Sequence, residues 1–370
     1  MMTQSLRSFL AVAISFSLVK SGLARPEVLE DLSGFDRPVA TVFAPDGKAL
    51  FVVNRSRGEV GARRGAGSIT KMSVDSDLQF KVASKRFVVG LTAPSDVDFL
   101  PVELEGVAPK DSLILVSGTP LIESEDGRME KNASDDLIGF TLFDPLTGKT
   151  LAKADFSPEA DLRFNGEYPL ISPNSMSFDR SGNLYVADTG IGGNLFRNRV
   201  KAQPVMYRIS VSGLLQMFSG QSPSGVEVMK LSSIPGDISY HQEEDAVYFL
   251  ANHLQGASRG SVFKVSSRNF TEVMKIETVV RELTSLASMI ISPTGRTLIA
   301  SAKGELLIPR NRKSARLIRF KPEMTYSSPG KFDYLSLSGG DFIVAMPEEA
   351  GDAGAGKGQR VRITRLTNRY

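Results

Sequence analysis

A hairpin unit that recurs along the whole chain constrains the fold more than any other feature of the sequence. Each copy has a proline or small residue, an alternating apolar run, a tight turn, and a second apolar run that ends on a polar side chain. Pro45-Asp46-Gly47, Ser181-Gly182-Asn183 and Pro293-Thr294-Gly295 are typical turn sequences between runs of β-branched and aromatic residues. Clear copies begin near residues 38, 173, 235 and 287, and weaker copies begin near 94 and 332.

Further strands are expected after each hairpin, and together they favour an all-β chain with one architecture. Six units of four antiparallel strands predict a six-bladed β-propeller. A two-sheet sandwich is the competing fold, but it does not explain six hairpins of one kind. The expected third strands are 68–74, 138–143, 205–209, 262–265 and 317–320, and 214–218 is an expected fourth strand.

The two ends of the chain are expected to close the ring. Residues 361–366 read as the third strand of the last blade, which then lacks a fourth. Segment 27–32 precedes the first hairpin and can supply that strand, which would hide the sheet edges. The chain has no cysteine, so strand pairing and packing must do what disulfides do in many exported proteins.

The first residues are typical of a secretion signal. Arg7 precedes an apolar stretch, 8–19, that is too short for an easy membrane span, and Ser21-Gly22-Leu23-Ala24 permits cleavage after Ala24. We therefore expect a signal peptide at 1–24 and a single exported propeller domain at 25–370, with no stable membrane span after cleavage. An uncleaved anchor or a buried helix is the alternative.

Composition excludes several classes of function. The formal charge of +3 gives no electrostatic case for nucleic-acid binding. Without cysteine there is no thiol catalysis, and with two histidines a multi-histidine zinc centre is disfavoured. The chain also has no phosphate-binding Walker loop, which leaves kinase chemistry without support.

One hairpin resembles a known family. SPNSMSFDRSGNLYVADTG, residues 172–190, is similar to the unit of NHL-repeat propellers and of the gluconolactonase, senescence-marker-protein and strictosidine-synthase-like superfamily. The resemblance is strong in this hairpin and faint elsewhere. It implies a six-bladed propeller and, in the gluconolactonase-like members, a divalent metal at the top of the channel.

The resemblance also implies which residues would hold that metal, which is usually calcium in this family. Asp36, Asn174 and Asp237 stand at or near the family's ligand positions. Asp237 stands one place late, so a bulge at Gly236 is needed to turn it toward the channel. Carboxylate and amide oxygens suit calcium. Each residue could instead have a purely structural role: Asn174 could cap the loop of its strand, Asp36 could pair with Arg37 in solvent, and Asp237 could close a turn.

One rim of the channel is expected to be the working face. First strands should start there and second strands end there, so their polar terminal residues would gather at it. Long connections between second and third strands should emerge at the same rim, which is typical of binding faces. These connections are 55–67, 119–136, 189–203, 303–313 and 347–359, and the rim residues expected to contact a ligand are Asp96, Asn54, Asp188, Asn252 and His253.

Two functions stay open on the sequence alone. The first is an NHL-like propeller that binds a small molecule or a protein partner through the rim. The second is a calcium-dependent, gluconolactonase-like hydrolase that acts on a lactone or related ester. The residues identify no catalytic side chain, so whether the chain is an enzyme is left open. We expect a monomer.

Overall fold

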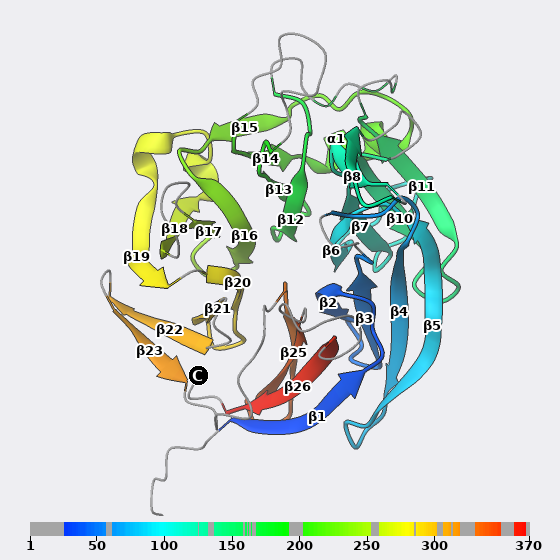
Figure 1. The fold of residues 1–370 in the computed structure, drawn as a ribbon. Helices are drawn as coiled ribbons and strands as arrows, with labels where there is room; N and C mark the ends of the chain where they lie inside the picture. The colour runs from blue at the N-terminus through cyan, green and yellow to red at the C-terminus, as the bar shows by residue number, and fades with distance from the viewer. Residues whose placement is uncertain are drawn as a thin grey trace, which may run out of the picture.

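The computed structural model shows six four-stranded antiparallel sheets arranged around a central channel (Figure 1). The predicted six-bladed β-propeller is therefore confirmed. Among the described residues, no helix has both the length and the apolar character needed to cross a bilayer. The predicted signal peptide and His253 lie outside the described residues, which are 26–367 except 57–60, 125, 132–136, 158–159, 161, 163, 165–167, 192–202, 253–258, 285, 302–305, 312–313, 319–329 and 349–358.

The first three blades follow the expected pattern of a hairpin extended by two outer strands. A small extra hairpin, β8 (Leu121–Glu123) and β9 (Met129–Lys131), rises from the long connection of the second blade. The blades are β2 (Pro38–Phe43), β3 (Ala49–Asn54), β4 (Gly67–Val74) and β5 (Phe80–Leu91); β6 (Pro94–Phe99), β7 (Leu113–Ser117), β10 (Gly139–Phe143) and β11 (Thr150–Asp155); and β12 (Pro173–Phe178), β13 (Leu184–Asp188), β14 (Val205–Ile209) and β15 (Glu227–Lys230).

The last three blades repeat the pattern, and the sixth takes its outer strand from the start of the chain. Two short 3-10 helices, Ser267–Asn269 and Val273–Lys275, connect strands of the fourth blade. The blades are β16 (Ile234–His241), β17 (Ala246–Asn252), β18 (Arg259–Ser266) and β19 (Glu277–Thr284); β20 (Leu286–Ile291), β21 (Thr297–Ser301), β22 (Leu306–Asn311) and β23 (Ser314–Ile318); and β24 (Asp333–Ser336), β25 (Phe342–Glu348), β26 (Arg360–Leu366) and β1 (Glu27–Ser33).

The closure of the ring is as predicted. β1 pairs antiparallel with β26, in a register that runs from Glu27 opposite Arg365 to Ser33 opposite Arg360 (Figure 1). Charged side chains reinforce this pairing: the Arg362 Nε lies 2.8 Å from Asp31 Oδ1, and an Arg360 guanidinium nitrogen lies 3.2 Å from Asp31 Oδ2. Arg362 is 1% exposed whereas the Asp31 side chain is 42% exposed, so a buried guanidinium meets a carboxylate at the surface where the two ends of the chain pair.

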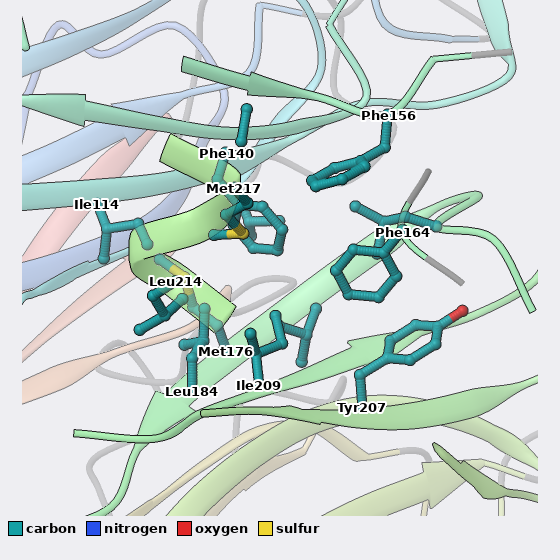
Figure 2. Packing of buried hydrophobic residues seen from close by; sticks show 14 of the residues in the cluster. Ile114, Phe140, Phe156, Phe164, Met176, Leu184, Tyr207, Ile209, Leu214 and Met217 are labelled. Carbon is teal, nitrogen blue, oxygen red and sulfur yellow. The ribbon is translucent and has the colours of Figure 1, made fainter. Parts of the chain in front are cut away.

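Two expected outer strands are wrong. Residues 214–218 belong to a helix, α1 (Val211–Phe218), and β15 is the fourth strand of that blade. Ser210 caps the helix by accepting from the Gly213 N–H, and buried Leu214, Met217 and Phe218 recur at helical spacing. Leu214 and Met217 point into the core cluster (Figure 2). The apolar residues at 214–218 were therefore assigned to a strand, although their spacing follows the 3.6-residue period of a helix.

In the fifth blade the third strand begins earlier than predicted. It is β22, and the expected strand at 317–320 overlaps the fourth strand, β23. Much of the supposed rim connection 303–313 is thus sheet. Pro309 hid this strand, because proline argues against a strand in sequence, yet here it lies opposite Ala315 beside a register irregularity.

Apolar packing explains why the blades hold together. Each of the six interfaces between neighbouring blades contains a cluster of buried hydrophobic side chains. The cluster between the second and third blades includes Phe140, Phe164 and Tyr207, with α1 packed against it (Figure 2). Both faces of each sheet are therefore buried, which accounts for the apolar second strands.

Candidate functional site

A one-residue bulge near the start of the first strand sets which side chains occupy the channel. The register shifts between Pro94 and Asp96 and between Pro235 and Asp237, and the same shift occurs in three other blades. The bulge that Asp237 required at Gly236 is therefore present. Its consequence is that five residues occupy equivalent positions in five blades: Ala40, Asp96, Ser175, Asp237 and Ser288.

These polar residues connect each blade to the next. Asp96 Oδ2 accepts from the Met176 N–H at 2.7 Å, and Asp237 Oδ2 accepts from the Met289 N–H at 2.8 Å. Ser175 Oγ accepts from the Ile238 N–H at 3.2 Å. The first strand is the inner edge of its sheet, where backbone N–H groups have no neighbouring strand. The channel acids and hydroxyls satisfy these edge amides.

Lys331 crosses the channel and neutralises the acids. Its backbone lies beside β2, where Lys331 N–H donates to Val39 O at 2.9 Å. Its Nζ lies 2.5 Å from Asp96 Oδ2 and 3.9 Å from Asp237 Oδ1. Burial by itself lowers the pKa of Lys331, but the carboxylates of Asp96, Asp237 and Asp98 raise it more. The ammonium therefore stays charged at physiological pH.

A cavity of about 110 Å³ lies next to Lys331 within the channel. Its lining residues come later in the first strands than the bulges, so the cavity lies toward the hairpin turns and away from the loop-rich rim. The lining is mixed: its polar side chains are those of Asp98, Asp333, Thr41, Ser177, Ser239 and Lys331, and the others are mostly aliphatic or aromatic.

Asp98 and Asp333 are the two acids of this cavity. Burial raises the pKa of Asp98 to about 6, although Lys331 opposes the shift. Burial likewise raises the pKa of Asp333 to about 6, against the N–H groups of Phe43 and Tyr334. Asp333 joins its blade to β2, because its Oδ2 accepts from the Phe43 N–H. Asp98 Oδ1 accepts only from the N–H of the next residue, Phe99. Asp98 Oδ2 has no hydrogen-bond partner among the described residues.

These two acids, together with Asp96, should make the protein more stable in mild acid. Burial raises the pKa of Asp96 to about 7, although Lys331 opposes the shift. All three folded pKa values exceed the ordinary value, so the folded state binds more protons than the unfolded chain between about pH 4 and 7. Their contribution to stability is present in acid and is lost as the pH rises through about 6 to 7. We expect an unfolding temperature roughly 2–5 °C higher at about pH 5.5 than at about pH 7.5.

Differential scanning calorimetry across this range checks the expectation. Asp98→Asn should make the pH dependence of the unfolding temperature less steep, because an amide does not bind a proton in this range. The charges that face residue 98 from the other blades are those of Lys331 and Asp333. An unfolding temperature that rises with pH in this window, or a slope unchanged in the variant, would contradict the assignment.

The residues predicted to hold a metal do not fit that role. Asp237 Oδ1 accepts from Ser175 Oγ and the Ile238 N–H, and Oδ2 accepts from Ser288 Oγ and the Met289 N–H, so each oxygen already accepts two hydrogen bonds that hold the blades together. Among the described residues, no group of three or more His, Cys, Asp and Glu side chains is placed to hold a metal ion.

The other two predicted ligands are engaged elsewhere. The Asn174 amide donates to Gly236 O at 2.5 Å, which joins the third and fourth blades at their bulges. Asp36 is exposed, and its carboxylate accepts from the Ser56 hydroxyl. The calcium site stays a prediction that these contacts disfavour, and no reaction step is derived from it.

The predicted rim residues serve the fold in the same way. The Asn54 amide donates to Thr70 Oγ1 at 3.1 Å, and the Asp188 carboxylate accepts from three backbone N–H groups. Asn252 exchanges two hydrogen bonds with the backbone of Leu286 and so joins the fourth and fifth blades. Asp96 lies in the buried network around Lys331.

The long connections of the first two blades hold each other. Glu123, which is 3% exposed, accepts from the Gly61 N–H at 2.7 Å, and its Oε1 lies 3.3 Å from an Arg63 nitrogen. The pairing shows that part of the charge on these two connections is used within the protein.

Sequence reasoning missed Asp98 and Lys331. A signal existed for Asp98, because it follows Asp96 by two residues in a strand and so faces the same side. Lys331 precedes the first strand of the sixth blade and belongs to no motif, so its position in the channel could be seen only in the tertiary structure.

The comparisons with known proteins bear on the fold. No family model matches the chain, and no curated protein matches its sequence. The α-L-arabinanase of Penicillium chrysogenum, solved with arabinobiose, is 14% identical with a TM-score of 0.59, and the match covers 93% of this chain and 99% of that chain. The α-L-arabinofuranosidase of Fusarium graminearum with arabinobiose is 15% identical with a TM-score of 0.57, over 92% and 98%.

A third similar structure has a different chemistry. The PQQ-bound aldose sugar dehydrogenase of Streptomyces coelicolor is 11% identical with a TM-score of 0.53, and the match covers 92% of this chain and 98% of that chain. At these identities the likeness concerns the fold alone. The resemblance to six-bladed propellers is confirmed at that level, and function must be argued from the site.

Proposed function

We propose that this protein is a ligand-binding propeller that takes a small polyhydroxylated ligand, neutral or positively charged, in its acidic channel cavity. The observation that carries the proposal is Asp98. It is a half-buried carboxylate with a raised pKa, it lines the cavity, and one of its oxygens has no partner among the described residues. A perturbed acid in a polar cavity is typical of a binding or active site.

The chemistry of the lining supports this ligand class. Ser177 Oγ accepts from the Tyr240 N–H, so its proton is available to a ligand oxygen. Hydroxyls and carboxylates together suit a polyol, and the two acids favour a cation. Proteins of the same fold bind such molecules: the Fusarium graminearum arabinofuranosidase has been solved with an iminosugar inhibitor as well as with arabinobiose.

Calorimetric titration with three probes tests the proposal. L-arabinose, arabinobiose and an arabinose-configured iminosugar should bind at millimolar concentration or better, the iminosugar most tightly because its protonated nitrogen meets Asp98. Asp98→Asn should weaken iminosugar binding about tenfold, which corresponds to about 1.4 kcal/mol.

Glu227→Gln is the matched control, because it removes an exposed acid from the outer strand β15 and should leave the affinities unchanged. The proposal is wrong if none of the three probes binds, or if Asp98→Asn binds the iminosugar as tightly as the native protein.

Hydrolysis without a metal is the second candidate function. It is favoured by Asp98 and Asp333, which line the same cavity and whose pKa values are both raised to about 6, so that a singly protonated pair is populated near that pH. Such a pair can act as general acid and general base. Turnover of an aryl arabinofuranoside or of a gluconolactone, lost in both Asp98→Asn and Asp333→Asn, would support this function over binding alone.

Export and a protein partner at the rim are further parts of the proposal. The apolar stretch after Arg7 and the small residues before Arg25 support removal of residues 1–24. Protein recovered from its native compartment should have the mass of a chain that begins at Arg25, as measured by intact-mass spectrometry. A mass that includes residues 1–24 would contradict cleavage.

A further inference from the structure

We propose that the Lys331 ammonium is the resident cation of this channel, in the role that a bound metal plays in the resembled family, and that removing it creates a binding site for an added cation. This inference concerns the network around the Lys331 ammonium, which also lines the cavity, and its test measures stability without the proposed ligand.

The atoms around the ammonium resemble the coordination of a hard cation. Lys331 Nζ lies 2.5 Å from Asp96 Oδ2, 2.5 Å from Met176 O, 3.3 Å from Ser175 Oγ and 3.9 Å from Asp237 Oδ1. The four oxygens come from a carboxylate, a carbonyl, a hydroxyl and a second carboxylate. Oxygen sets of this kind also bind calcium.

The two acids need a cation at this place. Asp96 is 0% exposed and Asp237 is 1% exposed, so both carboxylates are removed from water. Two buried negative charges that face the same channel repel each other strongly unless a positive charge lies between them. The carboxylates cannot move away, because each accepts the N–H of the next residue in its own strand and one N–H of the following blade.

A tethered ammonium differs from a metal in one measurable way. Lys331 enters the channel on a backbone that is hydrogen-bonded to β2 on both sides, through Val39 O and the Thr41 N–H. The cation therefore cannot dissociate, and stability should not depend on the concentration of any metal. A divalent ion would have to displace a positive charge that already makes the same contacts.

Thermal unfolding with added cations tests the inference on the full chain. The unfolding temperature of the native protein should not move with millimolar calcium, magnesium or manganese, and elemental analysis should find no stoichiometric metal. Lys331→Ala should unfold at a lower temperature, and calcium or ethylammonium should raise that temperature in a concentration-dependent way, because each binds the folded state alone.

Lys264→Ala is the matched control. It removes a lysine that pairs with Glu244 on the outer side of a blade, and neither cation should change its stability. If Lys331→Ala does not fold, the double variant Lys331→Met with Asp96→Asn removes both charges. It should fold, and it should not respond to calcium.

Three outcomes would overturn the inference. The first is a native protein that calcium stabilises by several degrees. The second is a Lys331→Ala variant as stable as the native protein without added cation. The third is a destabilised Lys331→Ala variant that neither calcium nor ethylammonium restores.

Discussion

Deletion of residues 26–33 should abolish the cooperative unfolding transition of the propeller. These residues contain β1, which supplies the outer strand of the sixth blade and pairs with β26 along its length. Without β1, Arg362 loses the Asp31 carboxylate although its own side chain is buried, and β26 becomes an exposed edge. Loss of a whole paired strand, with the burial of Leu32 and the contacts of Asp31, should remove a large part of the total stability of about 5–15 kcal/mol.

Calorimetry and size-exclusion chromatography of the deleted chain measure this effect, with aggregation expected through the free edge. A synthetic peptide of residues 26–33, added in trans, should restore part of the transition. The same peptide with Asp31 replaced by alanine should restore less, because it cannot pair with Arg360 and Arg362. A deleted chain that unfolds at the native temperature would show that the ring does not depend on this closure.

Asp237→Ala should be among the most destabilising single substitutions in the described channel. Its carboxylate accepts four hydrogen bonds and faces Lys331, and it is 1% exposed. The substitution leaves the edge amide of Met289 and two hydroxyls without their acceptor. We expect a loss of about 3–5 kcal/mol and an unfolding temperature lower by roughly 5–15 °C.

The same variant separates a structural role from a metal-ligand role. Glu243→Ala removes an exposed acid from the turn that follows the same strand and should change the stability little. The Asp237→Asn variant keeps one acceptor oxygen, so its stability should lie between those of Asp237→Ala and Glu243→Ala. Our account requires the loss for Asp237→Ala to be equal with calcium and with a chelator. A loss that appears only in calcium would restore the predicted metal site.

Several features of the fold could be predicted because they depend on local chemistry. Turn sequences such as Pro45-Asp46-Gly47 and the apolar second strands identify the hairpins without any partner, since both reflect backbone preferences and burial. The closure by β1 followed from counting strands, because a blade with three strands leaves an edge that something must cover. The outer strands were harder, and α1 and β22 were misassigned where local patterns were ambiguous.

The candidate site could be predicted only in part. Sequence indicated that Asp96 and Asp237 stand at the starts of inner strands, and this is where they lie. Which atoms surround them depends on the bulges and on the neighbouring blade, so their use as acceptors for Met176 and Met289 was not visible.

A closed ring of six hairpins could be predicted from the chain alone, because turn chemistry and alternation act between residues that are near each other in the chain. The side chains that fill the channel depend on contacts between distant segments. Lys331 meets Asp96 across 235 positions of the chain, and no local pattern encodes a contact between a residue outside the repeat and blades on the far side of the ring. The charge balance of the channel, and with it the distinction between a metal site and an internal ion pair, is therefore a property of the assembled ring.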